Sequence, residues 1–119
     1  MISLDDYNTY CGSLPATNHV VQWGGAHVWK VGTKVFAIGG WSDGEELAVT
    51  FKCSPQSYDI LKEQPGLRPA PYLASRGMKW IQMLNEETFS VDDLKIYLKE
   101  SHRLAADNLT KKVRAELGL

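Results

Sequence analysis

The sequence predicts an α+β fold: a two-layer domain in which an N-terminal, a middle and a long C-terminal helix pack on one face of an antiparallel sheet. Three observations predict it. Residues 4–13 follow a capping serine and end before a proline, residues 46–52 alternate between apolar and partly polar, and apolar residues recur at helical spacing over 91–117. The 119 residues, 44% of them hydrophobic, fit one domain over 1–119.

The N-terminal helix is predicted over residues 4–13. Ser3 can cap it, because a serine hydroxyl accepts a hydrogen bond from a backbone N–H of the first turn, and the two aspartates that follow suit the positive end of the helix dipole. The same Ser-x-Asp-Asp pattern begins at Ser90, ahead of the C-terminal helix. The first helix ends before Pro15, since a residue that precedes proline avoids helical geometry.

The middle of the chain predicts a sheet. Residues 27–31 and 34–38 are rich in β-branched and aromatic side chains, and the Gly32-Thr33 pair between them is typical of a two-residue hairpin turn. Residues 46–52 form a third strand, whose apolar and partly polar positions alternate as in a sheet with one face on a core. A further strand is expected around 20–23.

The second half of the chain combines helices with one more strand. Ser54-Pro55 is a helix start, because proline at the first helical position loses no hydrogen bond, and that helix is expected to run to about Glu63. Residues 67–73 form an ordered loop or extended piece, and 78–84 form the last strand. Residues 91–117 are expected to make one helix, roughly 40 Å long at 1.5 Å per residue.

Composition excludes several classes of protein. The 13 basic and 14 acidic residues give a net charge of −1, which argues against a strongly basic nucleic-acid binder. No apolar run is long enough to cross a membrane, and the N-terminus does not resemble a signal peptide. Cys11 and Cys53 are far apart and form no CxxC motif, so we expect reduced, buried thiols. A cytoplasmic location and a monomeric state are also expected.

No motif supports catalysis. His19, His27 and His102 have no cysteine or carboxylate at metal-ligand spacing, and the sequence has no HExxH, CxxC or GxSxG motif. We therefore expect no metal, no cofactor and no enzymatic activity. An unrecognised enzyme would need a concave site at which His27, His102 or Cys53 converge.

Positive charge is distributed unevenly along the chain. Residues 1–51 hold two basic and five acidic residues, whereas residues 52–119 hold eleven basic and nine acidic ones. The excess lies in 62–79 and 95–114. Because salt screens charges within about 10 Å, such clusters matter more for phosphate contacts than the sum over the molecule. Two interpretations of these basic clusters remain open: a local phosphate-binding face, or the solvated side of a long helix.

The stretch Pro65–Leu73 carries three prolines, which restrict its backbone before folding. A rigid loop that presents Arg68 and Tyr72 suits binding, since a guanidinium can hold a phosphate with two hydrogen bonds and a tyrosine can stack or donate one. The alternative is structural: Tyr72 and Leu73 close the edge of the core while Arg68 is solvated. Of the four tryptophans, we expect most to lie in the core and one near the hairpin to be exposed.

Several segments together resemble the MmcQ/YjbR family, small bacterial proteins described as DNA-binding. The Pro-Gly-x-x-Pro-Ala-Pro-Tyr-Leu stretch followed by Lys-Trp is the most specific of them. The matching residues are Lys30–Ala37, Phe51-Lys52 leading to Pro55, Pro65–Leu73, Lys79–Ile81, Ser101 and Leu109–Arg114. Where family members often carry an aromatic residue after the serine of the last helix, this chain has His102.

The resemblance implies a fold similar to that of frataxin and CyaY, and DNA binding by a double-wing arrangement of hairpins and loops that flank a helix. It does not imply iron binding, because only Asp5 and Asp6 are acidic on the first helix. The candidate nucleic-acid-binding residues that it implies are Lys30, Lys34, Lys52, Arg68, Tyr72, Lys79, Lys111, Lys112 and Arg114.

The leading hypothesis is therefore a non-enzymatic protein that binds nucleic acid, most simply duplex DNA, through its phosphates. In it the Gly32-Thr33 hairpin acts as a wing, and the basic residues of the proline loop and the C-terminal helix supply charge. The alternative is a binding module for a small anionic ligand or a protein partner at the Arg68/Tyr72 loop.

Overall fold

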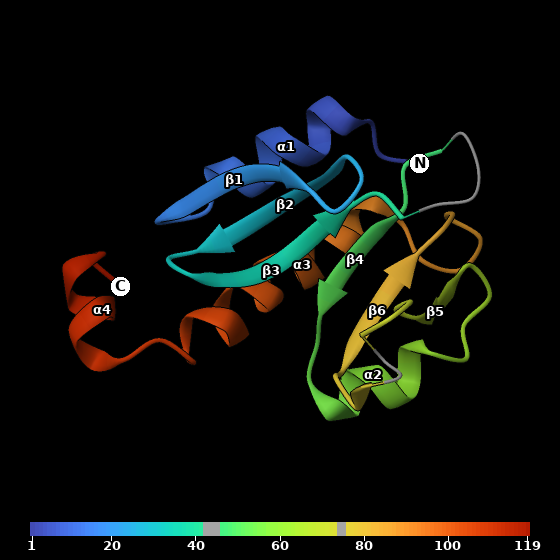
Figure 1. The fold of residues 1–119 in the computed structure, drawn as a ribbon. Helices are drawn as coiled ribbons and strands as arrows, with labels where there is room; N and C mark the ends of the chain where they lie inside the picture. The colour runs from blue at the N-terminus through green and yellow to red at the C-terminus, as the bar shows by residue number, and fades with distance from the viewer. Residues whose placement is uncertain (42–45, 74–75) are drawn as a thin grey trace.

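The computed structural model describes residues 1–41, 46–73 and 76–119. Its centre is a six-stranded sheet in the order β1-β2-β3-β4-β6-β5, in which every neighbouring pair is antiparallel (Figure 1). The strands are β1 (Thr17–Gln22), β2 (Ala26–Val31), β3 (Lys34–Gly39), β4 (Val49–Lys52), β5 (Leu67–Pro69) and β6 (Trp80–Met83). The fold is α+β, and the prediction of an antiparallel sheet is confirmed.

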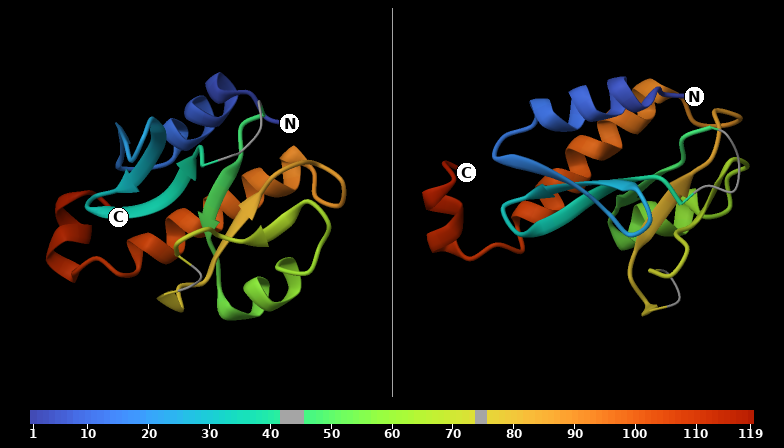
Figure 2. Two further views of the ribbon diagram at one scale, coloured as in Figure 1. Left: turned by 45° about the vertical axis from the view of Figure 1, so that its right-hand side comes forward. Right: turned by 45° about the horizontal axis from the view of Figure 1, so that its top comes forward.

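The helices form the second layer. They are α1 (Leu4–Ser13), α2 (Pro55–Leu61), α3 (Val91–Ala106) and α4 (Lys111–Glu116). α1 packs on β1 to β3 and α3 on β2 to β4, and Figure 2 shows both on the same side of the sheet. Leu61 of α2 joins the same buried cluster as Leu94 and Leu98 of α3. In the part of the chain that the structure describes, no helix has the length and apolar composition needed to cross a bilayer.

The helix starts are confirmed at atomic level. The side chains of Ser3, Ser54 and Ser90 each accept a hydrogen bond from the backbone N–H three residues on, at 3.0, 3.1 and 3.0 Å. At Ser90 the bond is reciprocal, because the Asp93 carboxylate accepts from the Ser90 N–H at 3.0 Å, which completes a capping box. Local sequence therefore determines where these helices begin.

The single long C-terminal helix predicted over 91–117 is wrong: the chain leaves helical geometry after Ala106 and starts α4 at Lys111. Thr110 caps the new helix, with its side chain accepting from the Val113 N–H at 3.2 Å. Leu109, in the break, is buried and packs beside Gly32 of the β2–β3 hairpin. The apolar spacing continues through the break, so periodicity alone could not reveal it.

Other boundaries shift by a few residues. The third predicted strand, 46–52, begins only at Val49, and the strand predicted over 78–84 is Trp80–Met83. The proline stretch supplies a short edge strand at Leu67–Pro69 before it turns away. Within it, Gly66 has φ of 87°, and an added Cβ would lie 2.3 Å from the Asn85 side-chain oxygen, which explains the glycine at this position.

Candidate functional site

No described helix packs on the second face of the sheet, hereafter the open face. In each strand the side chains that point to it alternate with those of the helix-covered core. The row that crosses it in register, one residue per strand in sheet order, is Val20, Val28, Ile38, Thr50, Gln82 and Arg68. The row is apolar over β1 to β3 and polar over β4 to β5, which is a composition unlike that of the helix-covered face.

A polar network occupies the second half of this row. Arg68 Nε donates to the side-chain oxygen of Gln82 at 2.7 Å, and the Gln82 amide nitrogen lies 3.2 Å from the Trp41 carbonyl and 3.4 Å from that of Gly40. Gln82 is fully buried, and so is its neighbour Thr50, whose hydroxyl has no partner among the described residues. The network therefore fixes the backbone at Trp41 and holds the guanidinium of Arg68.

Beside the network lies a cleft of about 550 Å³, hereafter the aromatic cleft, lined by Trp23, Trp41, Tyr72, Leu73 and Arg76. Trp41 touches both other rings: its centroid lies 5.8 Å from that of Trp23 and 5.7 Å from that of Tyr72. Trp23 is 53% exposed and Tyr72 71% exposed. Aromatic rings left this accessible in one concavity are typical of a ligand site.

The backbone beneath the aromatic cleft is strained. The φ angle is 54° at Trp23, 63° at Trp41 and 68° at Tyr72. For residues with a Cβ this left-handed region costs roughly 1–3 kcal/mol each, and such strain gathers at functional sites. Three bulky side chains in this conformation around one cleft mark it as the least ordinary place on the surface.

A second hollow lies at the end of the sheet where β3 begins and β4 ends. Lys34 and Lys52 line this pocket of about 270 Å³ together with Trp80 and Asn108; it is hereafter the lysine pocket. The ammonium nitrogen of Lys52 lies 5.9 Å from the centroid of the Trp80 ring. The Trp80 indole nitrogen is buried without a partner among the described residues.

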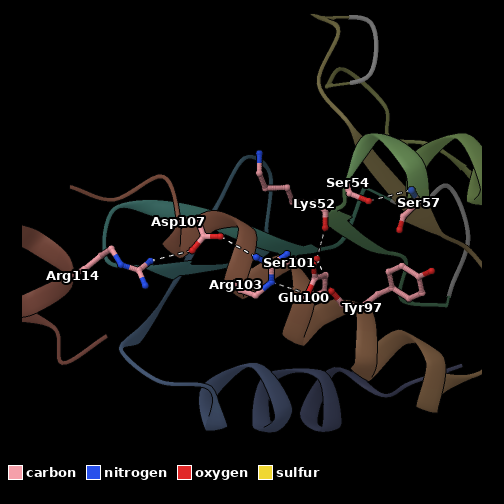
Figure 3. Close-up of polar contacts among 9 residues, drawn as sticks. All are labelled: Lys52, Ser54, Ser57, Tyr97, Glu100, Ser101, Arg103, Asp107 and Arg114. Atoms are coloured by element: carbon pink, nitrogen blue, oxygen red, sulfur yellow. Dashed lines mark hydrogen bonds and ion pairs between the residues drawn. The ribbon is translucent and has the colours of Figure 1, made fainter. Parts of the chain in front are cut away.

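α3 anchors the backbone of the lysine pocket. The fully buried hydroxyl of Ser101 contacts the carbonyl oxygens of Lys52 and Tyr97, the latter at 2.8 Å (Figure 3). A serine is small enough to sit between helix and strand here, and its hydrogen bond satisfies the last carbonyl of β4. Ser101, which the resemblance singled out, is thus a structural link that positions the strand end bearing Lys52.

The basic residues predicted from the sequence do not gather in one place. Lys34 and Lys52 share the lysine pocket, while Arg68 belongs to the polar network and Tyr72 to the aromatic cleft. Lys30 lies on β2, paired in register with Val35.

Of the other predicted basic residues, some contact an acidic or aromatic side chain and some have no such partner among the described residues. The Lys79 ammonium lies 4.8 Å from the centroid of the Tyr58 ring of α2. Arg114 pairs with Asp107 at 3.3 Å, whereas Lys111 and Lys112 are exposed on α4 and make no ion pair among the described residues. Arg103 joins Glu100 and Asp107 in the same chain of ion pairs, drawn in Figure 3.

Trp23, Trp41, Arg76 and Gln82 were not predicted as site residues. Trp23 precedes a Gly-Gly pair and Trp41 follows one, as the sequence shows. An aromatic residue beside two glycines in a turn is a signal that could have directed attention to them. The exposed tryptophan is Trp23, which lies at the β1–β2 turn and not at the Gly32-Thr33 hairpin where it was expected. Only the tertiary structure brings them together.

The histidines and cysteines considered for catalysis have separate neighbours. His27 lies beside His19, with 3.0 Å between ring nitrogens, and His102 lies 2.7 Å from the Pro15 carbonyl. Burial raises the pKa of the Cys11 and Cys53 thiols to about 12, so both are protonated at neutral pH and poor nucleophiles. Among the described residues, no group of three His, Cys, Asp or Glu side chains could hold a metal ion.

Solved structures share the fold, among them two bacterial proteins. The DR2400 protein of Deinococcus radiodurans, described as carrying the family-model domain DUF419, matches all of this chain and 90% of its own length with a TM-score of 0.85 at 24% identity. A Pseudomonas syringae protein, structural genomics target PsR293, matches 87% of this chain and 99% of its own with a TM-score of 0.69 at 16% identity. No curated protein matches. The model of the YjbR family matches residues 12–104, most of the sequence, and the chain therefore belongs to the YjbR family.

Proposed function

We propose that this chain is a non-enzymatic protein that binds nucleic acid, in the first place duplex DNA, through phosphate contacts made at the lysine pocket. The observation that carries the proposal is the convergence of Lys34 and Lys52, from two different strands, on one pocket that Asn108 also lines. Neither lysine makes an ion pair among the described residues. A phosphate group suits such a site, because it can accept from both ammonium groups.

The C-terminal helix extends this surface. Asn108 of the lysine pocket lies shortly before α4, and the two leucines that flank α4, Leu109 and Leu117, both approach Gly32 of the β2–β3 hairpin. Lys111 and Lys112 therefore follow directly from the pocket along the chain, beside the hairpin expected to act as a wing. Arg114 contributes less, since Asp107 already neutralises it.

Salt dependence tests the proposal. We expect a fluorescein-labelled duplex to bind the full chain at low salt, with an affinity that falls as salt rises by a log–log slope near −0.9 per phosphate contact. The double variant Lys34→Gln/Lys52→Gln should weaken binding and reduce the slope by about 2. Lys95→Gln/Lys99→Gln is the matched control, because it removes the same charge from α3, and it should leave the slope unchanged.

Two results would overturn the proposal. The first is no detectable binding of the duplex at low salt. The second is an equal effect of the two double variants, which would show that only net charge matters and that the lysine pocket has no part in binding.

The alternative expected from the sequence, a small anionic ligand or protein partner at the Arg68/Tyr72 loop, makes the opposite prediction. Arg68→Ala should abolish binding of such a ligand, whereas Lys111→Ala and Lys112→Ala should leave it intact. The hydrogen bond from Arg68 to Gln82 supports a positioning role for this arginine within that alternative.

We also propose a cytoplasmic location and a frataxin-like arrangement. Both cysteines are free and buried, which fits a compartment that keeps thiols reduced. Helices α1 and α3 on one face of an antiparallel sheet support the likeness to frataxin. Thiol accessibility of the protein in intact cells, and superposition on frataxin, test these two points.

A further inference from the structure

The aromatic cleft offers a binding site separate from the lysine pocket. We propose that it binds a nucleotide, with the base against the rings of Trp23, Trp41 and Tyr72 and the phosphate toward Arg76. The inference does not rest on duplex binding, because it requires neither Lys34 nor Lys52, and it gives a chemical identity to the small anionic ligand of the alternative at the Arg68/Tyr72 loop. A volume of about 550 Å³ lies within the range of small-molecule sites.

The relative orientation of the rings defines how a base can lie. Trp23 is tilted by 34° to Trp41, and Tyr72 stands at 82° to it, so Tyr72 is a steep wall beside Trp41 while Trp23 forms a shallow slope on the other side. In each of these two ring pairs the centroids lie less than 6 Å apart, whereas a planar group inserted between two stacked rings needs a separation of about 7 Å. The base must therefore lie over Trp41, against the exposed surfaces of Trp23 and Tyr72.

Charge decides which planar ligand fits. Three aromatic rings alone would suit a quaternary ammonium group, because the ring faces attract cations. The lining here also contains Arg76, which is exposed and makes no ion pair among the described residues. Its guanidinium repels a cation and can hold a phosphate with two hydrogen bonds, so the lining that the structure describes favours an aromatic ligand that carries negative charge.

The floor of the cleft is held in place before any ligand arrives. Gln82 donates to the Trp41 carbonyl and accepts from Arg68, and all three backbone segments belong to or adjoin the sheet. The left-handed backbone at Trp41 is thereby fixed. A ligand then loses little affinity to ordering of the protein, which is the advantage of a preorganised site.

Tryptophan fluorescence titration of the full chain tests the inference with four probes: adenosine 5′-monophosphate, adenosine, ribose 5-phosphate and choline. We expect the nucleotide to bind most tightly, adenosine and ribose 5-phosphate to bind more weakly because each lacks one half of the recognised chemistry, and choline not to bind.

Two variants assign the contacts. Trp23→Ala, a change at an exposed turn, should weaken nucleotide binding about tenfold, since stacking of a base on an aromatic side chain contributes roughly 1–3 kcal/mol. Arg76→Gln should lower the affinity for the nucleotide to that for adenosine. Lys99→Gln, which removes an exposed positive charge from α3, is the matched control and should leave it unchanged.

The outcomes separate the possibilities. Choline binding better than the nucleotide, equal binding of ribose 5-phosphate and the nucleotide, or no effect of Trp23→Ala on binding would overturn the inference. The inference would also be overturned if the unchanged chain bound no nucleotide and the Trp23→Ala variant sedimented differently from it. The cleft would then be an interface between protein chains. Binding of an oligothymidine single strand but not of the mononucleotide would support the site and assign its ligand to single-stranded nucleic acid.

The same variants distinguish this inference from duplex binding. Trp23→Ala should leave the salt slope for duplex DNA unchanged, and Lys34→Gln/Lys52→Gln should leave nucleotide binding unchanged. Failure of one proposal therefore does not imply failure of the other.

Discussion

The two faces of the sheet differ in what they bury. The helix-covered face holds the larger core, in which Tyr7, Phe36 and Leu98 are fully buried beneath α1 and α3. The open face has a smaller apolar cluster, and beside it are the polar network around Gln82, two buried polar atoms without a partner among the described residues, and aromatic residues in left-handed conformations. An antiparallel sheet needs only one covered face to be stable. We propose from this difference that stability resides mainly in the helix-covered layer and binding at the open face.

The largest effect should come from the helix-covered face. Leu98→Ala removes a fully buried side chain from the centre of α3 and should lower the free energy of unfolding by about 2–5 kcal/mol. Trp23→Ala removes a larger side chain from the open face, yet it should cost less than about 1 kcal/mol, because half of that ring is already exposed. Urea denaturation followed by circular dichroism measures both. Equal losses would contradict the division of roles between the faces.

The sequence was sufficient to predict the helix-covered layer. Helix starts at Ser3, Ser54 and Ser90 depend on hydrogen bonds within four residues, and a sheet strand with one buried face shows its alternation locally. The break before α4 was missed because Leu109 is apolar at a helical position in either arrangement. It is the contact with the distant Gly32 that places it.

The candidate site was less predictable. Lys34 and Lys52 could be selected for their charge, but their convergence depends on the pairing of β3 with β4. The aromatic cleft brings together a turn, the end of a strand and a proline loop, which are separated by long stretches of chain. No local pattern encodes that meeting, and the role of Gln82 beneath it depends on a fully folded sheet.

An intermediate effect is expected from the polar network. Gln82→Leu leaves the Trp41 carbonyl and Arg68 Nε without their buried partner, and it should lower the free energy of unfolding by about 1–3 kcal/mol. It should also abolish nucleotide binding, since the floor of the cleft loses its support. Gln22→Leu, on an edge strand, is the control and should change neither quantity. A fully stable Gln82→Leu protein that still binds nucleotide would show that the network has no such role.

A smaller effect, of opposite sign, is expected at Thr50. Its hydroxyl is buried without a partner among the described residues, so Thr50→Val removes an unsatisfied group and should raise the free energy of unfolding by about 1 kcal/mol. The matched variant Thr17→Val should instead destabilise, because the Thr17 hydroxyl donates to the Leu14 carbonyl at 3.1 Å. Paired urea titrations check the signs. Destabilisation by both variants would mean that Thr50 has a hydrogen-bond acceptor in solution.

The smallest effect is a change of stability with pH, and we expect it to arise in the helix-covered layer. His19 stacks between His27 and Trp29, and partial burial, followed by the nearby His27, lowers the pKa of His19 below its usual 6.5. In the pH range just below that value the unfolded chain binds more protons than the folded one, so stability should fall as pH decreases through 6.5. His19→Gln removes this dependence. Thermal unfolding at pH values from about 7.5 to 5.5 measures it, above the range in which carboxylates titrate. If the stability of His19→Gln depended on pH as steeply as that of the unchanged chain, the stacked histidines would not contribute to the acid response. The two layers would then respond to acid alike.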